Sequence, residues 1–324
     1  MVEHFLGKEE VVSSSLINSS EKFKDNGMPP FQVAFVISSS AVRKQVRVIR
    51  INKININYMK IAIIGAGNMG GAVARGLAQG CIVATSDIYV ANPSMAKLHA
   101  LKEAFPEINI TTNNCEAVAA ADLIVLAVKP WKVEGVLNEI KPCMDYSHQA
   151  VASMVGGLGI AQLSEWLDKG CGLLPATYIL IPNTAIATKS SMTFIASVRT
   201  TAEQDQTLLA IFAELGEAML IEESQMPAAT SLASCGIAYA LRYIRAAMEG
   251  GVELGIRADD AKRIVMQTLR GAVDVLAANE SHPEAEIDRV TTPGGLTIKG
   301  LNAMEAAGFT HSVIEGLRAS TKRN

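Results

Sequence analysis

The chain has 324 residues, a length that suits one large domain or two of ordinary size. Hydrophobic residues make up 49% of it and charged residues 19%, which provides for a sizeable core and little disorder. The 29 Lys and Arg nearly balance the 32 Asp and Glu, so the charge offers no basic field for nucleic acid or an anionic membrane.

The five cysteines form no C-x-x-C pair. We therefore expect no structural zinc site and no disulfide framework, and we expect a reducing, cytoplasmic location. The longest uncharged stretch, residues 224–241, contains a proline and several hydroxyls and is not expected to span a membrane.

Residues 1–58 differ from the rest of the chain, with runs of serine and a segment rich in Ile, Asn and Lys. We expect an extension that is disordered or is translated upstream sequence, with the natural start at Met59, because a strand pattern begins immediately afterwards. The alternative is an organelle-targeting arm, since basic residues alternate with Val and Ile near residues 43–50.

From Met59 the pattern predicts alternating strands and helices. Short apolar runs bounded by turn residues predict strands over residues 60–64, 87–91, 108–112, 123–128, 150–155, 177–181 and 192–197. Such alternation favours a mostly parallel sheet with helices on both faces. After residue 222 apolar residues recur at helical spacing. The predicted fold class is therefore α/β plus all-α, with a Rossmann-like dinucleotide-binding domain over 59–222 and a helical domain over 223–324.

A glycine-rich loop follows the first predicted strand and opens a helix. Gly65, Gly67 and Gly70 form a G-x-G-x-x-G motif, with Asn68 and Met69 between the last two glycines. In this context the motif indicates a pyrophosphate site, because the start of a helix offers free amides and a positive dipole. A tight turn without a ligand is the alternative.

The end of the second predicted strand bears on the choice of coenzyme. An acidic residue there would bind the ribose 2′-hydroxyl and repel a 2′-phosphate, but the sequence has Asn92 and Ser94, with Lys97 one turn later. These residues favour NADPH, with NADH as the alternative coenzyme. Ser94 could instead only cap a helix.

Further along, Ala127, Val128, Lys129 and Pro130 end the clearest buried strand, where ligands bind in open parallel sheets. Lys129 could instead be a solvated loop charge, and Asn114, at the start of a helix, could be only a cap.

In the helical part, residues 291–298 read TTPGGLTI. A Pro-Gly-Gly turn followed by a helix brings several free N–H groups and hydroxyls together, which suits a substrate carboxylate. An ordinary interhelical turn is the alternative.

These residues together resemble the pyrroline-5-carboxylate reductase family. The resemblance runs from Met59 to Asn324, and its most specific part is the last of six segments: IGAGNMGGA, LAVKP, IPNTAIAT, AYALRYIRAAMEGGVELG, QTLRGAVDVL and HPEAEIDRVTTPGGLTIKGLNAMEAAGF. It implies a Rossmann-like domain followed by a helical dimerisation domain. It also implies NAD(P)H-dependent reduction of 1-pyrroline-5-carboxylate to L-proline, the last step of proline synthesis, by a homodimer or a ring of dimers.

The resemblance also implies site residues. Thr297 matches the threonine whose hydroxyl bonds the substrate ring nitrogen, and the loop that holds the substrate carboxylate matches Val290, Thr292, Gly294 and Gly295. Asn114, residues 127–130 and Asn183 match cofactor contacts.

Three departures from the family pattern stand out. The family's S-G-S-G-P-A-Y is ASCGIAY here, with Cys235 and Ile237, and its S-P-G-G-T-T-I is TPGGLTI, with Leu296. Pro93 stands where many bacterial members have Arg. The first two departures leave open an imine reductase acting on a related cyclic amino acid.

Two other functions compete with the reductase. A β-hydroxyacid dehydrogenase would carry a lysine on the first long helix of its second domain, and no lysine lies between Glu222 and Ala261. A non-catalytic NADP-binding sensor would need no carboxylate receptor. Reduction of an imine needs no strong general acid, because the imine is basic enough to arrive protonated or to take its proton through one hydroxyl and water.

Overall fold

The structure is a computed structural model, and it describes residues 59–321. The expected extension over residues 1–58 lies outside the described residues.

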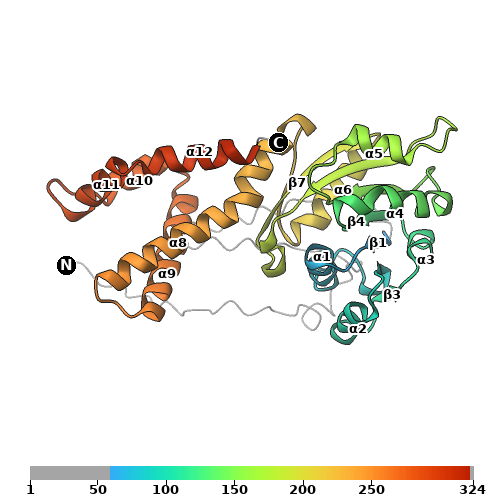
Figure 1. The fold of residues 1–324 in the computed structure, drawn as a ribbon, viewed down its shortest axis with the longest axis horizontal. Coiled ribbons are helices and arrows are strands. Elements are labelled where there is room, and N and C mark those ends of the chain that lie inside the picture. Colours follow the sequence, from blue (N-terminus) through green and yellow to red (C-terminus); the bar gives the residue numbers. More distant parts are fainter. Residues whose placement is uncertain (1–58, 322–324) are drawn as a thin grey trace, which may run out of the picture. The chain divides into compact units, whose positions relative to one another are not determined.

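An eight-stranded sheet forms the first part of the fold, in the order β3-β2-β1-β4-β5-β6-β7-β8 (Figure 1). The strands are β1 (Ile61–Ile64), β2 (Ile88–Ala91), β3 (Asn109–Thr111), β4 (Leu123–Leu126), β5 (Ala150–Ser153), β6 (Ala176–Ile181), β7 (Ser191–Val198) and β8 (Gly216–Leu220). The first six pair in parallel in the order 3-2-1-4-5-6, which is that of a dinucleotide-binding fold. The predicted Rossmann-like architecture is confirmed.

Helices cover both faces of the sheet, which explains why its central strands are apolar throughout. Ile61 and Ile63 pack into a core with α1 (Asn68–Ala78), α2 (Met95–Ala104) and α6 (Ala202–Ala213). Ala62 and Ile64 point the other way, into a core with α3 (Asn114–Ala119), α4 (Val133–Ile140) and α5 (Ile160–Leu167). All four residues of β1 are at most 1% exposed. A strand buried on both faces has no alternation of polar and apolar residues.

Two features of the sheet were not predicted. β7 runs antiparallel to β6, with Leu180 opposite Ile195, and β8 then pairs parallel to β7. β8 is an edge strand in which no residue is buried, so its sequence, GEAML, lacks the apolar run that identified the other strands.

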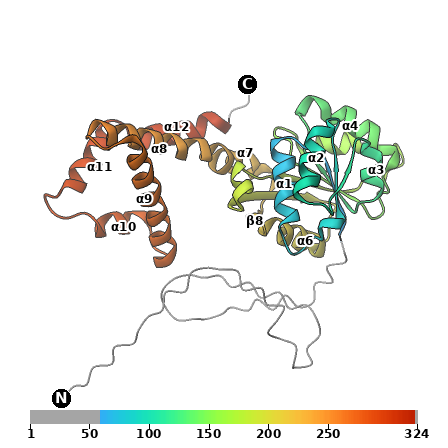
Figure 2. The ribbon, with the colours of Figure 1, turned by 90° about the horizontal axis from the view of Figure 1, so that it is seen from below.

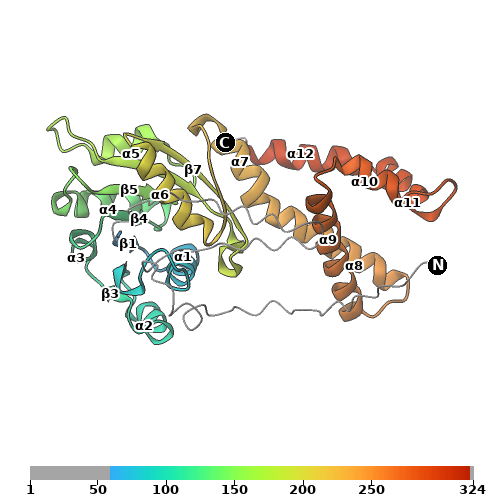
Figure 3. The same cartoon turned by 180° about the vertical axis from the view of Figure 1, so that it is seen from behind.

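The second part of the fold is helical, as predicted. It comprises α7 (Met226–Ala229), a π-helical segment η6 (Thr230–Cys235), α8 (Gly236–Glu253), α9 (Ala258–Asn279), α10 (Pro283–Arg289), α11 (Leu296–Ala306) and α12 (Phe309–Thr321). α8 and α9 form a helical hairpin (Figure 3). α12 runs back toward α7 (Figure 2), and it contacts η6.

These helices bury very little within one chain. Of residues 236–321, Ala261 alone is buried, whereas Leu241 and Val273 are 59% and 66% exposed. The apolar stripes that predicted the helices therefore have no partner inside the chain. Within residues 59–321, none of the helices has the length and apolarity that crossing a bilayer would require.

Candidate functional site

The glycine loop lies at the point where the strand order reverses, at the carboxyl ends of β1 and β4. Gly65 has φ +109°, a conformation that a side chain would strain, and its N–H donates to Ala91 O at 2.8 Å. Gly70 is buried, and a Cβ there would overlap the carbonyl oxygen of Gly65 and lie 2.8 Å from the Cβ of Ala127. The turn therefore brings the start of α1 close to the end of β4.

The start of α1 has the features of an anion site. Gly67 is its N-cap and supplies no side-chain cap, so the helix leaves its first-turn N–H groups, at Asn68, Met69 and Gly70, without that partner. A Cβ on Gly67 would meet no protein atom within 4 Å, so the backbone faces open space. Asn68 is exposed, whereas Met69 packs partly against the core. Open space and uncapped amides fit a dinucleotide pyrophosphate.

Asn92 connects the glycine loop to the loop after β2. Its Oδ1 accepts from Ala66 N at 3.0 Å, and its Nδ2 donates to Ser94 O at 3.2 Å. These bonds position the backbone on both sides of the site and leave one N–H and one oxygen lone pair of the side chain for a ligand. Ser94 is the exposed N-cap residue of α2, but its hydroxyl makes no capping hydrogen bond. The Ser94 hydroxyl is thus open to a ligand.

The segment after β4, residues 127–130, lies at the same edge of the sheet, next to the glycine loop. Ala127 N donates to Ile64 O at 2.9 Å, which continues the pairing of β4 with β1 beyond the strand. Ala127 and Val128 are half-buried beside Gly65, whereas Lys129 and Pro130 are exposed. These four residues lie where the strand-end rule places a ligand.

Asn114 does not cap its helix. Asn113 is the N-cap of α3, and its Oδ1 accepts from Cys115 N at 3.0 Å and Glu116 N at 3.3 Å. Asn114 is the first helical residue, and its Nδ2 donates to Glu139 Oε2 at 3.0 Å. The capping alternative therefore applies to the preceding residue.

The expectation that the chain has no disulfide was wrong. Cys115 and Cys143 are bonded, with their Cα atoms 5.7 Å apart. The two cysteines are 28 positions apart in the sequence, so no short motif identifies the pair. The C-x-x-C criterion could not find it, because the fold alone brings α3 and the end of α4 together. Cys81, Cys171 and Cys235 are free.

Asn183 joins the end of β6 to the helical part. The residue is 6% exposed, its Oδ1 accepts from Ala185 N at 3.0 Å, and its Nδ2 donates to Ala233 O at 3.5 Å. Ser234 Oγ donates to Pro182 O at 3.3 Å beside it. Both contacts fall on the π-helical segment η6, which contains Cys235 and lies in the sequence where the chain departs from the family pattern. Short π-helical segments are frequent at functional sites.

The loop between α10 and α11 has a defined turn. Gly294 has φ +69°, and Gly295 N donates to Thr292 O at 2.9 Å. Thr291 Oγ1 donates to Ile287 O at 2.7 Å, which ties the loop to α10. Gly295 is the N-cap of α11 and gives no side-chain cap, so α11 also begins with free amides.

The hydroxyls of Thr292 and Thr297 are exposed and make no hydrogen bond within residues 59–321. Val290 is 67% exposed. Between residues 59 and 321, no hydrogen bond joins residues 290–297 to the sheet or its helices. The structure thus brings the predicted cofactor residues together at one sheet edge and the predicted substrate residues together at one loop, but a single chain does not hydrogen-bond the two groups to each other.

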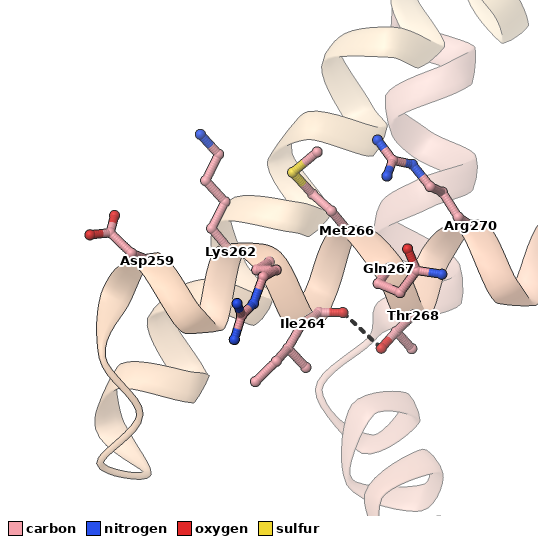
Figure 4. A pocket seen from close by; sticks show the side chains of 8 residues that line it. Asp259, Lys262, Ile264, Met266, Gln267, Thr268 and Arg270 are labelled. Carbon is pink, nitrogen blue, oxygen red and sulfur yellow. Dashed lines mark hydrogen bonds between the residues drawn. The ribbon is translucent and has the colours of Figure 1, made fainter.

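A hollow of about 720 Å³ lies along α9 (Figure 4). Side chains of that helix line it, among them Lys262, Met266, Gln267 and Arg270. It contains none of the predicted site residues. The hollow belongs to the face of α9 that is exposed in one chain.

Glu286 lies in α10, the helix that precedes the loop before α11. It accepts hydrogen bonds from Ser281 Oγ and from Asn279 Nδ2, and it forms an ion pair with Arg289. The Ser281 hydroxyl foremost, then Asn279 and Arg289, hold the pKa of Glu286 below its ordinary value.

We expect this carboxylate to contribute its full stabilisation above the ordinary pKa of a glutamate, about 4.3. A lowered pKa in the folded state gives stability that is lost as the pH falls through that pKa. The Tm of Glu286→Gln should therefore lie below that of the wild type at neutral pH, and the difference should shrink as the pH falls below about 4.3. An equal difference at every pH would contradict this role.

Comparison with known proteins adds two family matches. Residues 223–324 match the family model described as pyrroline-5-carboxylate reductase dimerisation. Residues 60–155 match the one described as NADP oxidoreductase, coenzyme F420-dependent.

Several curated relatives carry the same name. Pyrroline-5-carboxylate reductase 2 of Dictyostelium discoideum is 37% identical over 285 residues, 83% of this chain and 93% of that protein. Pyrroline-5-carboxylate reductase 2 of Bacillus subtilis is 31% identical over 82% of this chain and 94% of that protein. Pyrroline-5-carboxylate reductase 1 of Dictyostelium is 35% identical over 81% of this chain, but the match spans only 49% of that protein.

Solved structures agree. Plasmodium falciparum pyrroline carboxylate reductase with NADP bound is 28% identical, with a TM-score of 0.72 over 81% of this chain and 95% of that chain. The pyrroline-5-carboxylate reductase of Coxiella burnetii is 26% identical, with a TM-score of 0.75 over 82% and 97% of the two chains.

The sheet order and the uncapped glycine loop define a Rossmann-type dinucleotide-binding fold with a helical second part, and the family match over residues 60–155 places it among the NADP oxidoreductases. The chain belongs to the pyrroline-5-carboxylate reductase family.

Proposed function

We propose that the protein reduces 1-pyrroline-5-carboxylate to L-proline with NADPH, and that the residues described above perform the reaction. The observation that carries the proposal is the pair of uncapped helix starts: one follows a dinucleotide-type glycine loop, and the other follows a Pro-Gly-Gly turn beside two free threonine hydroxyls. The relatives named above support the same reaction.

The first helix start and its surroundings hold the coenzyme. The amides after Gly67 bind the pyrophosphate, and Asn92 keeps the glycine loop and the Ser94 loop in register. Ala127 to Pro130, Asn114 and Asn183 line the remaining contacts. When bound, NADPH supplies the hydride that reduces the imine carbon.

The second helix start holds the substrate. The amides near Gly294 and Gly295, with the dipole of α11, bind the carboxylate. Thr292 and Val290 border the loop, and the hydroxyl of Thr297 bonds the ring nitrogen. A protonated imine is already activated, so the protein's main contribution is to orient it against the coenzyme.

The helical part joins two subunits. Its apolar residues have no cover in one chain, and their exposure supports a homodimer, or a ring of dimers, in which the partner's helices bury them. The boundary between the coenzyme domain, 59–222, and the dimerisation domain, 223–324, falls just before α7. The near-balanced charge supports a protein without nucleic-acid or anionic-membrane partners.

Coenzyme choice rests on Ser94. Its hydroxyl is exposed and uncapped at the start of α2, where a 2′-phosphate can accept a hydrogen bond. Ser94→Asp should reverse the preference, because a carboxylate repels the phosphate and accepts from a ribose hydroxyl. We expect the ratio of kcat/KM for NADPH to that for NADH to fall at least about tenfold, worth about 1.4 kcal/mol.

Ser94→Ala is the matched control. It should lower kcat/KM for NADPH without raising kcat/KM for NADH. If the aspartate variant kept the wild-type ratio, this loop would not select the coenzyme.

A second candidate is an imine reductase that acts on a related cyclic amino acid. Leu296 is 86% exposed next to Thr297, where the family pattern has a hydroxyl, and this observation favours it. Comparing kcat/KM for pyrroline-5-carboxylate and for its six-membered homologue separates the two. A higher value for the five-membered ring supports proline formation, and a higher value for the six-membered ring supports the alternative.

A further inference from the structure

The Cys115–Cys143 bond links the start of α3, beside the proposed coenzyme contact Asn114, to the segment that follows α4. Cys115 is in the first turn of α3, directly after Asn114. Cys143 ends the short segment η3 (Lys141–Cys143), which follows α4. Cys115 therefore adjoins a proposed coenzyme contact, whereas Cys143 lies beyond the end of α4 that is farther from residues 127–130.

Non-covalent contacts lie beside the bond and join the same two helices. Asn114 Nδ2 donates to Glu139 Oε2 at 3.0 Å, and Cys115 Sγ lies 3.4 Å from Glu139 O. Residues of α3 and the end of α4 also pack in one core, through Val118 and Ile140. The helices therefore stay neighbours without the bond. The Asn114 side chain itself is then held against α4 by one exposed hydrogen bond, to Glu139.

The pair suits reversible chemistry. Both cysteines are half-buried, so the pair is not enclosed in the core of the domain. The Cα separation of 5.7 Å is ordinary for a disulfide, and the same backbone accommodates two thiols. Cys81 and Cys171 are exposed and free, which provides an internal control for unselective oxidation.

We propose that Cys115 and Cys143 form a reversible redox pair that tunes the affinity of the protein for NADPH through Asn114. This inference rests on the proposed function, because it takes Asn114 as a coenzyme contact. The disulfide form holds the start of α3 against α4 and presents Asn114 in one place. In the dithiol form the segment has more freedom, and part of the binding energy is used to order it.

The oxidant belongs to the class of small-molecule disulfides, of the glutathione type. One cysteine thiolate attacks the small disulfide, forms a mixed disulfide and releases one small thiol. The second cysteine thiolate attacks the mixed disulfide, forms the Cys115–Cys143 bond and releases the second small thiol. The protein loses two electrons and two protons, and the small disulfide gains them. Excess small thiol reverses both steps.

The test uses the whole protein, equilibrated with mixtures of reduced and oxidised glutathione. Peptide mapping by mass spectrometry measures the fraction of Cys115 joined to Cys143, independently of coenzyme. The Kd for NADPH is measured by fluorescence in the fully oxidised and the fully reduced state. We expect the pair to oxidise reversibly, and the disulfide form to bind NADPH about fivefold more tightly.

Matched variants separate the pair from other thiols. Cys143→Ser should bind like reduced wild type in either buffer, and Cys81→Ser should respond like wild type. The inference is overturned if the two cysteines never join in oxidised glutathione, or if wild type binds NADPH equally in both states while turning over pyrroline-5-carboxylate. Loss of NADPH binding and turnover in both states would instead contradict the proposed function.

Discussion

Gly67→Ala is expected to fold normally and to lose NADPH binding by about 100-fold, equivalent to about 3 kcal/mol. The φ of Gly67 is −73°, which alanine adopts readily, and no protein atom lies within 4 Å of the added Cβ. The methyl group would project into the space over the α1 amides that the pyrophosphate must approach. The measurement is the Kd for NADPH by fluorescence titration, together with the Tm.

Gly70→Ala provides the contrast. Its Cβ would overlap the carbonyl oxygen of Gly65 and crowd Ala127, so we expect the free energy of unfolding to fall by about 3 kcal/mol. One glycine is thus needed for the ligand and the other for packing. If Gly67→Ala bound NADPH as tightly as wild type, the result would contradict the assignment of the glycine loop as the pyrophosphate site.

Thr297→Ala is expected to lower kcat by about 10- to 100-fold, with the Tm and the Kd for NADPH unchanged. The Thr297 side chain is exposed and hydrogen-bonds no described residue, so its removal costs the fold little. The variant would lose the proposed hydrogen bond from the Thr297 hydroxyl to the substrate nitrogen, which orients the substrate. Steady-state kinetics with pyrroline-5-carboxylate at saturating NADPH measure the effect.

Thr297→Ser keeps the hydroxyl and should recover most of the lost kcat. Thr291→Ala is the structural control, because the Thr291 hydroxyl bonds Ile287 O, so its loss should lower the Tm first. Full activity in Thr297→Ala would end the proposed role of this hydroxyl.

The sequence predicts the coenzyme domain well because its strongest signals are local. β1 and β4 are continuous apolar runs, and the glycine loop follows β1 directly, so periodicity and motif point to the same edge of the sheet. β8 escaped prediction because an exposed edge strand needs no apolar run. The antiparallel direction of β7 was not predicted, because strand direction depends on pairing, which the residues of β7 alone do not encode.

The residues of the site could be proposed from local motifs and the family resemblance, but their contacts within the chain could not. Asn92 stays a predicted coenzyme contact, but its hydrogen bonds to Ala66 and Ser94 were not predicted. The Cys115–Cys143 bond depends on how α3 and α4 pack, over a separation of 28 residues. The contacts of Asn183 with η6 join segments about fifty residues apart, and only the folded chain reveals them.

The most direct test of the reductase assignment is NADPH oxidation by the purified protein with 1-pyrroline-5-carboxylate, with the product identified by chromatography. We predict rapid oxidation of one NADPH for each L-proline formed, and slower turnover with NADH. Tight NADPH binding without any proline formed would contradict the assignment, and would mean that the chain retains the fold of the family without its reaction.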